Sequence, residues 1–330
     1  MHTAPLGRCG IEVSRLSIGT ATFGAQCDER TSFQILDACA AAGVNLIDTA
    51  NAYPLGSAWA DKGASERIVG AWLKGRRQHF VIASKGGAKM GKLPTEQGNS
   101  RQHLLQAVDA SLQRLGTDHL DLYQLHYDDP HTPLDETLAA LDAIVRSGRA
   151  RQVGVSNFAA WRLARAMGRC ETRGWMGPVA VQPRYNLLFR QIERDLIPLC
   201  REEGLATLCY NPLAGGLLSG KHRQGAPAAA NSRFGAIGGA SLYKERYWHE
   251  REFVAVEAFT RLAADCGIAP VPLAIAWVLA QPGVTSAILG ASRPDQVQAA
   301  LLAADTVVPA DVMSRLNELS HEFRMGDASR

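Results

Sequence analysis

The sequence predicts a parallel eight-stranded (β/α)₈ barrel, a TIM-barrel fold of the α/β class, and two observations carry that prediction. Eight short runs rich in apolar and β-branched residues recur along the 330-residue chain, and helical patterns lie between them. Regular alternation of this kind is typical of a parallel sheet, and eight repeats favour a closed barrel over an open sheet. No linker or change of composition divides the chain, so we expect one domain over residues 1–330.

The expected strands are short and spread over most of the chain. They cover residues 16–20, 45–49, 80–85, 120–126, 152–156, 179–182, 205–210 and 285–290. The clearest amphipathic helices between them cover residues 65–75, 101–116, 134–148 and 193–204. Glycine readily ends a helix in the left-handed conformation, and we expect it to do so at Gly43, Gly116, Gly148 and Gly204.

Two connections are longer than the repeat requires. One is a polar stretch at residues 54–63, after the second strand, and the other covers residues 219–250, after the seventh. Long loops at the carboxyl ends of barrel strands are where such folds usually bind their ligands. We expect residues 311–323 to form a final helix, a C-terminal helical tail.

Composition limits the class of function. The net charge is +3, and lysine and arginine are scattered, so neither nucleic acid nor a membrane surface is an expected partner. No apolar run approaches the ~20 residues of a membrane span, and the N-terminus lacks the apolar region of a signal peptide, so we expect a cytoplasmic protein. The seven cysteines include no CxxC pair, which favours reduced and mostly buried thiols.

Four chemically distinctive side chains follow successive strands. Asp48, Lys85 and His126 end the second, third and fourth strands, and Tyr53 lies on the loop after the second. The ends of neighbouring barrel strands lie side by side on one face, so we expect these groups to converge. A buried carboxylate needs a cation, and Lys85 is the expected partner of Asp48.

This set suits the protonation of an oxygen that gains negative charge. A phenol is a poor acid at neutral pH unless its anion is stabilised, and a nearby ammonium supplies that stabilisation. A histidine can orient a carbonyl oxygen beside it. No residue of the set is a nucleophile, so the sequence predicts a cofactor that donates hydride. Each residue alone has a structural interpretation, and their coincidence at successive strand ends favours the functional one.

Polar residues also end the remaining strands. Amide side chains and a tyrosine ring are suited to hold a flat ring such as nicotinamide. These positions are Ser156, Asn157, Gln182, Tyr210, Asn211, Gly290, Ser292 and Arg293.

Two motifs point to other chemistry but fit it poorly. The run GGLLSGKH at residues 215–222 nearly matches a phosphate-binding GxxxxGK[ST] loop, but His222 replaces the hydroxyl residue. Its glycine-rich backbone and Lys221 are still suited to cradle a pyrophosphate. The run HYDDPH at residues 126–131 offers metal ligands, but adjacent strand positions point in opposite directions, so we expect no metal site.

Together these residues resemble the aldo-keto reductase superfamily over nearly the whole chain. The similarity runs from IGTATFG at residues 18–24 to RPDQ at residues 293–296. Its most specific parts are DTANAY at 48–53, SKG at 84–86, QLH at 124–126, VGVSN at 153–157 and YNPLAGGLLSGK at 210–221.

The resemblance implies a barrel that binds NADP(H) without a Rossmann domain. It implies that Tyr53 is the general acid, that Lys85 lowers the pKa of Tyr53, that Asp48 pairs with Lys85, and that His126 orients the substrate. By the same resemblance the cofactor would contact Thr20, Asp48, Ser156, Asn157, Gln182, Tyr210, Asn211, Pro212, Leu213, Gly215, Lys221, Arg233, Gly290, Ser292, Arg293 and Gln296.

One departure concerns the adenosine end of that site. Where relatives commonly continue Gln-x-x-Glu-Asn, this chain has QVQAA at residues 296–300, so Ala299 and Ala300 cannot supply the usual polar contacts. Each lost hydrogen bond is worth roughly 0.5–1.5 kcal/mol. The preference for NADPH over NADH therefore rests mainly on Arg293, which can pair with a phosphate.

The leading interpretation is reversible, NADPH-dependent reduction of an aldehyde or ketone. A cofactor-sensing regulatory subunit like the potassium-channel β subunits is the alternative, and a metal-dependent barrel hydrolase is the third. Trp59 and Trp248, on the two long loops, are the expected substrate contacts together with Tyr53 and His126. Aromatic residues at a pocket rim suit a bulky or ring-shaped substrate, although they can equally pack the loop onto the barrel.

Overall fold

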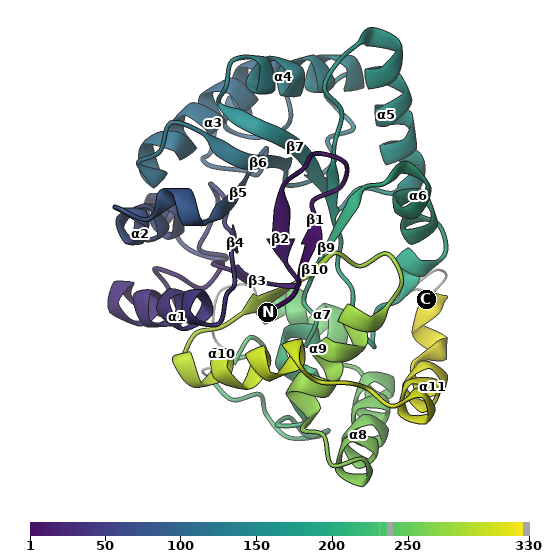
Figure 1. Ribbon diagram of the computed structural model, residues 1–330. Coiled ribbons are helices and arrows are strands. Elements are labelled where there is room, and N and C mark those ends of the chain that lie inside the picture. Colours follow the sequence, from purple (N-terminus) through teal and green to yellow (C-terminus); the bar gives the residue numbers. More distant parts are fainter. Residues whose placement is uncertain (231, 236–239, 326–330) are drawn as a thin grey trace.

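All eight expected strands form one closed parallel barrel in the computed structural model, which describes residues 1–230, 232–235 and 240–325. The order around the barrel is β10-β3-β4-β5-β6-β7-β8-β9, and helices surround it (Figure 1). The predicted (β/α)₈ barrel is therefore confirmed. Each observed strand overlaps its predicted range.

The element bounds follow the prediction to within a few residues. The barrel strands are β3 Leu16–Gly19, β4 Leu46–Asp48, β5 Val81–Gly86, β6 Leu120–Leu125, β7 Ala150–Ser156, β8 Ala180–Gln182, β9 Ala206–Tyr210 and β10 Ser286–Gly290. The helices are α1 Glu29–Ala41, α2 Ala64–Leu73, α3 Arg101–Leu115, α4 Leu134–Arg146, α5 Ala160–Arg173, α6 Leu196–Glu203, α7 Ala240–Tyr247, α8 Glu250–Asp265, α9 Pro270–Ala280, α10 Pro294–Leu301 and α11 Ala310–Leu319.

The predicted glycines lie where helices end. Gly116 and Gly204 are the left-handed C-caps of α3 and α6, each with φ of 63°. Gly43 and Gly148 have φ of 81° and 78° and follow the C-caps of α1 and α4 by one residue. A left-handed residue at these positions stops the helix and turns the chain toward the next strand.

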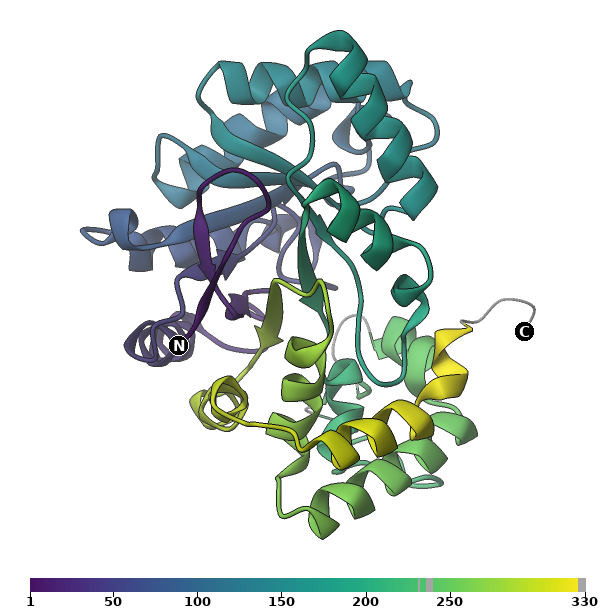
Figure 2. The same cartoon turned by 45° about the vertical axis from the view of Figure 1, so that its right-hand side comes forward.

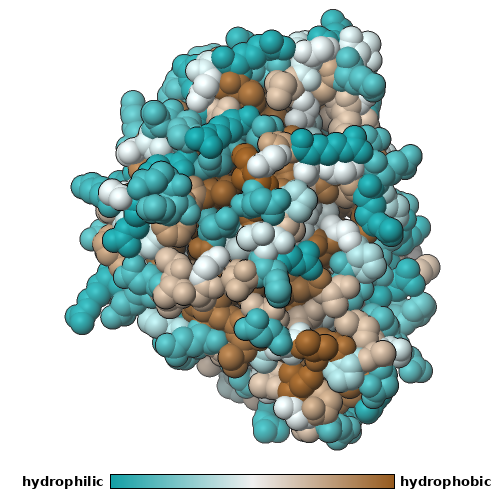
Figure 3. All heavy atoms as spheres, viewed as in Figure 1, coloured by the Kyte–Doolittle hydropathy of each residue, from teal (hydrophilic) through white to brown (hydrophobic). Residues whose placement is uncertain are grey.

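An antiparallel hairpin at the N-terminus was not predicted. Strands β1 (Thr3–Pro5) and β2 (Glu12–Ser14) pair with Ala4 opposite Val13, and the hairpin lies across one end of the barrel (Figure 1). Strands of three residues, one of them containing Pro5, are too short to give an alternating pattern. Figure 3 views this end and shows mostly hydrophilic side chains with scattered hydrophobic patches.

The hairpin plugs the barrel with apolar side chains. Leu6 and Val13 are fully buried and pack against residues inside the barrel. That interior cluster contains Leu46, Ala83, Leu122, Ala180, Ala206, Leu208 and Ile288. A larger cluster fills the space between the barrel and its surrounding helices. The amino end of the barrel is thus a packed core, and ligands must enter from the other end.

The two predicted long connections are present. Residues 49–63, after β4, contain a short 3₁₀ helix at Trp59–Asp61. Residues 211–249, after β9, contain a 3₁₀ helix at Ala214–Ser219 and the helix α7. Figure 2 shows the α7–α9 region on the same side of the molecule as α11.

The C-terminal tail is helical, as predicted, but its described residues do not line the ligand cavity. Helix α11 packs on α8, and Asn317 accepts a hydrogen bond from Trp277 Nε1 at 3.0 Å. The final 3₁₀ helix, His321–Arg324, buries Phe323. The apolar face of α11 packs on α8 and α9 and is not available to the cavity.

No single helix in the described residues is long and apolar enough to cross a membrane. Helices α8 and α9 meet that test only as a pair, and they are bent by 98° relative to each other.

Candidate active site

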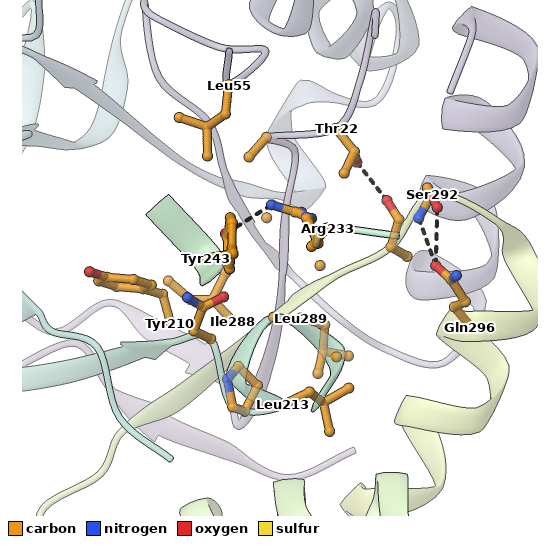
Figure 4. A pocket seen from close by; sticks show the side chains of 18 of the residues that line it. Thr22, Leu55, Tyr210, Leu213, Arg233, Tyr243, Ile288, Leu289, Ser292 and Gln296 are labelled. Atoms are coloured by element: carbon orange, nitrogen blue, oxygen red, sulfur yellow. Dashed lines mark hydrogen bonds between the residues drawn. The ribbon is translucent and has the colours of Figure 1, made fainter. Parts of the chain in front are cut away.

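A cavity of about 400 Å³ opens at the carboxyl ends of the barrel strands, a volume within the usual range for small-molecule sites. Tyr210 lies at one end and Ser292 with Gln296 at the other, while Arg233 and Tyr243 lie between them (Figure 4). The predicted residues that line it are Asp48, Tyr53, His126, Ser156, Asn157, Gln182, Tyr210, Asn211, Pro212, Leu213, Gly215, Lys221, Arg233, Gly290, Ser292, Arg293 and Gln296.

Asp48 and Lys85 form a buried ion pair beneath this cavity. Lys85 Nζ donates to Asp48 Oδ2 at 2.6 Å and to the carbonyl oxygen of Thr49 at 2.9 Å. Lys85 is fully buried and Asp48 is almost so. Burial lowers the pKa of Lys85, while the charge of Asp48 and their hydrogen bond oppose that shift. The two residues come from neighbouring strands β4 and β5, as their positions at the strand ends predict.

Two glutamines complete the hydrogen bonding of Asp48. Gln182 Nε2 donates to Asp48 Oδ1 at 2.7 Å, and Gln124 Nε2 donates to the same oxygen at 3.3 Å. Gln124 was not predicted as a site residue, although it lies in the QLH run before His126. The signal available in the sequence was its position two residues before His126, because alternate strand residues share a face.

Tyr53 reaches the same ammonium group. Its hydroxyl lies 3.4 Å from Lys85 Nζ, and its ring edge faces the ring of His126 with centroids 5.6 Å apart. Burial and the nearby Asp48 raise the pKa of Tyr53 well above 10.0. The net direction is opposite to the expectation that Lys85 lowers it. Desolvation of the phenolate is the largest cause, and the negative charge of Asp48 adds to it. The phenol is therefore held protonated.

His126 is a neutral imidazole at the cavity wall. Burial and the positive charge of Lys85 lower its pKa well below 6.5. Its ring stacks on Tyr127 with centroids 4.6 Å apart and an interplanar angle of 3°. His126 Nδ1 is buried and has no hydrogen-bond partner among the described residues. A buried polar atom without a partner is costly, so His126 is able to bond a ligand.

Residues at the ends of β7 and β9 are joined by hydrogen bonds. Asn157 has a left-handed backbone, with φ of 59°, and its Nδ2 donates to His126 O and to Ser156 Oγ, each at 3.0 Å. Tyr210 Oη donates to Asn157 Oδ1 at 2.8 Å. These bonds fix the ring of Tyr210 against the cavity and connect it to His126, just after β6.

The chain after β9 makes a sharp left-handed turn along the cavity. Asn211, Ala214, Gly215 and Gly216 all have positive φ. A side chain at Gly215 would collide with the ring of Tyr243, because a Cβ atom there would lie only 2.6 Å from Cδ1 of that ring. Asn211 Nδ2 is a buried donor without a partner among the described residues. The run at 215–222 thus lines the cavity as a turn and a 3₁₀ helix, and it lacks the helix that follows a nucleotide-triphosphate loop.

Cationic side chains gather toward the Ser292 end. Arg233 donates to Tyr243 Oη at 2.9 Å, and Arg293 makes two hydrogen bonds of 3.1 Å to Asp295. Lys221 is partly desolvated, and burial together with the charge of Arg293 lowers its pKa. Gln296 Oε1 accepts from Ser292 N at 2.9 Å (Figure 4). Ala299 and Ala300 also line this end and offer it only methyl groups.

These features fit a nicotinamide dinucleotide. The free donor of Asn211 suits a carboxamide or phosphate oxygen, and Lys221, Arg233 and Arg293 suit phosphate groups. The ring of Tyr210 lies at one end of the site, and Arg233 lies between it and Ser292 (Figure 4). The residues present are therefore compatible with a nicotinamide dinucleotide.

Three predicted contacts lie outside the cavity wall. Thr20 is buried behind it, where its Oγ1 accepts from Ser65 Oγ at 2.7 Å; its neighbours Ala21 and Thr22 face the cavity instead. Trp59 is 44% exposed on the surface. Trp248 packs among His222, Phe234 and Phe253. Both tryptophans were expected to contact the substrate, and the structure corrects that placement. Trp59 packs against Lys62, and Trp248 packs against the protein's own hydrophobic core.

The run at residues 126–131 is occupied by structural contacts. Asp128 pairs with Arg162 at 3.1 Å, and Asp129 accepts hydrogen bonds from the backbone of Asn99 and His131. In the described part of the chain no group of three His, Cys, Asp or Glu side chains is arranged to hold a metal ion.

The fold and the site define a (β/α)₈-barrel protein with a ligand cavity built on an Asp–Lys–Tyr–His cluster. Residues 15–321 match the model of the Aldo/keto reductase family. The chain belongs to this family of oxidoreductases.

Relatives in that family span nearly the whole chain. The sequence is 35% identical to "Uncharacterized oxidoreductase YrpG" of Bacillus subtilis, over 97% of this chain and 96% of that protein. It is 34% identical to "Probable voltage-gated potassium channel subunit beta" of Arabidopsis thaliana, over 93% and 92% respectively. It is 32% identical to "Aldo-keto reductase YhdN" of Bacillus subtilis, over 91% and 87%.

Proposed function

We propose that the protein reduces an aldehyde or ketone to the alcohol with NADPH, reversibly, with Tyr53 as the general acid. The observation that carries this proposal is the position of Lys85 Nζ, which bonds to Asp48 and lies 3.4 Å from the Tyr53 hydroxyl at the cavity. A protonated phenol beside a buried ammonium is equipped to release its proton, because the ammonium stabilises the phenolate that forms.

The four residues have distinct roles in this proposal. The Tyr53 hydroxyl donates its proton to the carbonyl oxygen, and His126, being neutral, holds that oxygen by a hydrogen bond. Lys85 offsets the negative charge left on Tyr53. Asp48, fixed by Gln124 and Gln182, keeps Lys85 in place and charged. When bound, the cofactor supplies the hydride that reaches the carbonyl carbon.

Cofactor binding is proposed to use both ends of the cavity. Ser156, Asn157 and Gln182 would hold the carboxamide and Tyr210 would stack on the nicotinamide ring. Asn211, Gly215 and the cations Lys221, Arg233 and Arg293 would take the phosphates, while Pro212, Leu213, Gly290, Ser292 and Gln296 complete the wall. Because Asp295 already pairs with Arg293 and Ala299 and Ala300 offer no polar atom, we propose a modest preference for NADPH over NADH.

The test compares wild type with Tyr53→Phe for NADPH binding and for oxidation of NADPH with a panel of aldehydes and ketones. We expect normal cofactor affinity and a rate loss of roughly 10²–10⁴-fold, the usual contribution of a general acid. Tyr123→Phe is the matched control, because its hydroxyl is buried in the barrel wall and bonds only weakly to Leu104 O, at 3.5 Å. A Tyr53→Phe enzyme with wild-type turnover would contradict the proposed role.

A second candidate function is that of a cofactor-binding regulatory subunit. Relatives from Arabidopsis thaliana, rice and fission yeast that carry the name of potassium channel β subunits favour it. Tight NADPH binding by wild type without turnover of any carbonyl in the panel, even in a single-turnover experiment, would support this candidate over the reductase.

A further inference from the structure

We propose that Arg246 recognises a negatively charged group on the substrate, so that the preferred carbonyl compounds carry a carboxylate or a phosphate. This inference rests on the proposed reductase function and names the class of its substrate. The observation behind it is an arginine in the wall of the cavity that makes no ion pair or side-chain hydrogen bond with any residue the structure describes.

Arg246 lies on helix α7, which hydrogen bonds hold in place beside the cavity. Leu242, Tyr243 and Arg246 all line the cavity, which is the spacing of one helical face. Tyr243 Oη accepts from Arg233 at 2.9 Å, and the buried Tyr247 Oη accepts from Asn186 Nδ2 at 3.0 Å. The arginine lies between two tyrosines that fix the helix, so its backbone position is determined by the fold.

The other cations of the cavity have a partner in the structure or suit a phosphate of the proposed cofactor. Among the described residues, four cationic side chains line it, namely Lys221, Arg233, Arg246 and Arg293, against the two carboxylates of Asp48 and Asp295. Asp48 bonds to Lys85, and Asp295 to Arg293. Lys221, Arg233 and Arg293 suit the phosphates of the dinucleotide. After these pairings, the charge of Arg246 is the one left over in the described part of the cavity wall.

Arg246 lies toward the catalytic end of the cavity. Its positive charge acts on Tyr127 and Tyr210, where it opposes the rise of the pKa that burial causes. Tyr127 stacks on His126, and Tyr210 bonds to Asn157. A substrate whose carbonyl oxygen lies at Tyr53 and His126 would therefore extend its remaining part past Tyr127 toward Arg246.

A carboxylate or a phosphate is the group that fits this position. A guanidinium binds either one through two parallel hydrogen bonds, and the partly desolvated cavity strengthens such bonds. Leu55 and Leu242 line the same cavity and suit the carbon skeleton between the two ends of the substrate. A neutral aldehyde would bond to Tyr53 and His126 but leave Arg246 without a partner.

The experiment compares matched pairs of substrates with wild type, Arg246→Met and Arg246→Lys. One pair is 4-formylbenzoate with its methyl ester, and the other is glyceraldehyde 3-phosphate with glyceraldehyde, which separates the carboxylate from the phosphate. Lys244→Met is the control, because it removes one charge from an exposed position on the same helix. KM and kcat are measured for each at low and moderate salt.

We expect Arg246→Met to reduce kcat/KM for the charged member of the preferred pair by roughly 10- to 100-fold, the worth of a hydrogen bond to a charged group. The loss should reside mainly in KM, and the neutral member should be little affected. Arg246→Lys should restore part of the discrimination, and Lys244→Met should match wild type. Equal changes for charged and neutral members, or no change, would overturn the inference.

Binding measurements separate failure of this inference from failure of the proposed function. The affinity of 4-formylbenzoate and of inorganic phosphate for the protein with bound NADP⁺ is measured by calorimetry for wild type and Arg246→Met. Loss of anion affinity in the variant supports the anion site even if no substrate is turned over. Unchanged affinity for both anions overturns it even if neutral aldehydes are reduced.

Discussion

The two ends of the same barrel differ sharply in the side chains that face its interior. At the amino end, apolar residues of the strands meet Leu6 and Val13 of the hairpin and form a buried apolar cluster. At the carboxyl end, the interior holds a carboxylate, an ammonium and two amides that bond to one another.

In five of the eight barrel strands the change occurs within a single step of two residues. Leu46 is followed on the same face by Asp48, and Ala83 by Lys85. The same step leads from Leu122 to Gln124, from Ala180 to Gln182 and from Leu208 to Tyr210. Because alternate strand residues share a face, the barrel carries one apolar layer that supports it and one polar layer that faces the cavity. The chemistry is thus confined to the polar layer, so a mutation in the apolar layer should change stability without changing turnover.

Removal of the cation from the polar layer should have the largest effect. Lys85→Met leaves Asp48 as a buried charge with only amide donors, so we expect a loss of ~3–5 kcal/mol in the free energy of unfolding. Turnover should fall by roughly 10²–10⁴-fold, as for loss of a general acid. Denaturant unfolding and NADPH oxidation measure the two effects.

The double variant Asp48→Asn/Lys85→Met is the control for that prediction. It removes both charges, so it should regain much of the stability while remaining inactive. A double variant as unstable as the single one would contradict the view that the uncompensated carboxylate is the cause.

Truncation in the apolar layer should affect stability alone. Leu6→Ala removes a fully buried side chain from the plug, and we expect it to lower the free energy of unfolding by ~2–5 kcal/mol. At temperatures where the variant is folded, KM for NADPH and kcat should equal those of wild type. Leu93→Ala, at a position 60% exposed, is the control and should change stability little. A fall in kcat with Leu6→Ala would show that the two layers are coupled.

Lowering the pH should destabilise the folded protein through His126, which lies beside the polar layer. The folded-state pKa of His126 lies well below 6.5, so between that value and 6.5 the unfolded chain binds more protons than the folded one. The free energy of unfolding should therefore fall as the pH is lowered below about 6.5, by at most ~1.4 kcal/mol per pH unit for this one group. His126→Gln should flatten this part of the curve, whereas Leu6→Ala should lower the curve without changing its slope. Denaturation midpoints measured between pH 4 and 8 test both expectations.

The smallest effect is expected at the far end of the cavity. Ala300→Asn places an amide where this chain has only a methyl group, and one new hydrogen bond to the cofactor is worth ~0.5–1.5 kcal/mol. Titration with NADPH and with NADH should show both bound more tightly. Gln298→Asn, on the exposed side of the same helix α10, is the control. Weaker binding by Ala300→Asn would mean that the pocket has no room for the amide.

Much of the fold and of the site could be read from the sequence because each depends on local pattern. Strand runs, helical periods and terminal glycines are properties of neighbouring residues, and the ends of parallel strands must lie together once the barrel closes. For that reason Asp48, Lys85, Tyr53 and His126 were correctly expected to converge.

The features that the sequence did not determine are those that depend on contacts between distant segments. The plug by Leu6 and Val13, the role of Gln124 beneath Asp48, and the placement of Trp59 and Trp248 away from the cavity are of this kind. So is the pKa of Tyr53, because the phenol responds to how deeply it is buried as well as to its charged neighbours. The sequence by itself determined which groups meet at the strand ends. Only the tertiary structure decided which of them face the cavity, how far water is excluded from them, and that Arg246 lies among them without a partner in the described part of the chain.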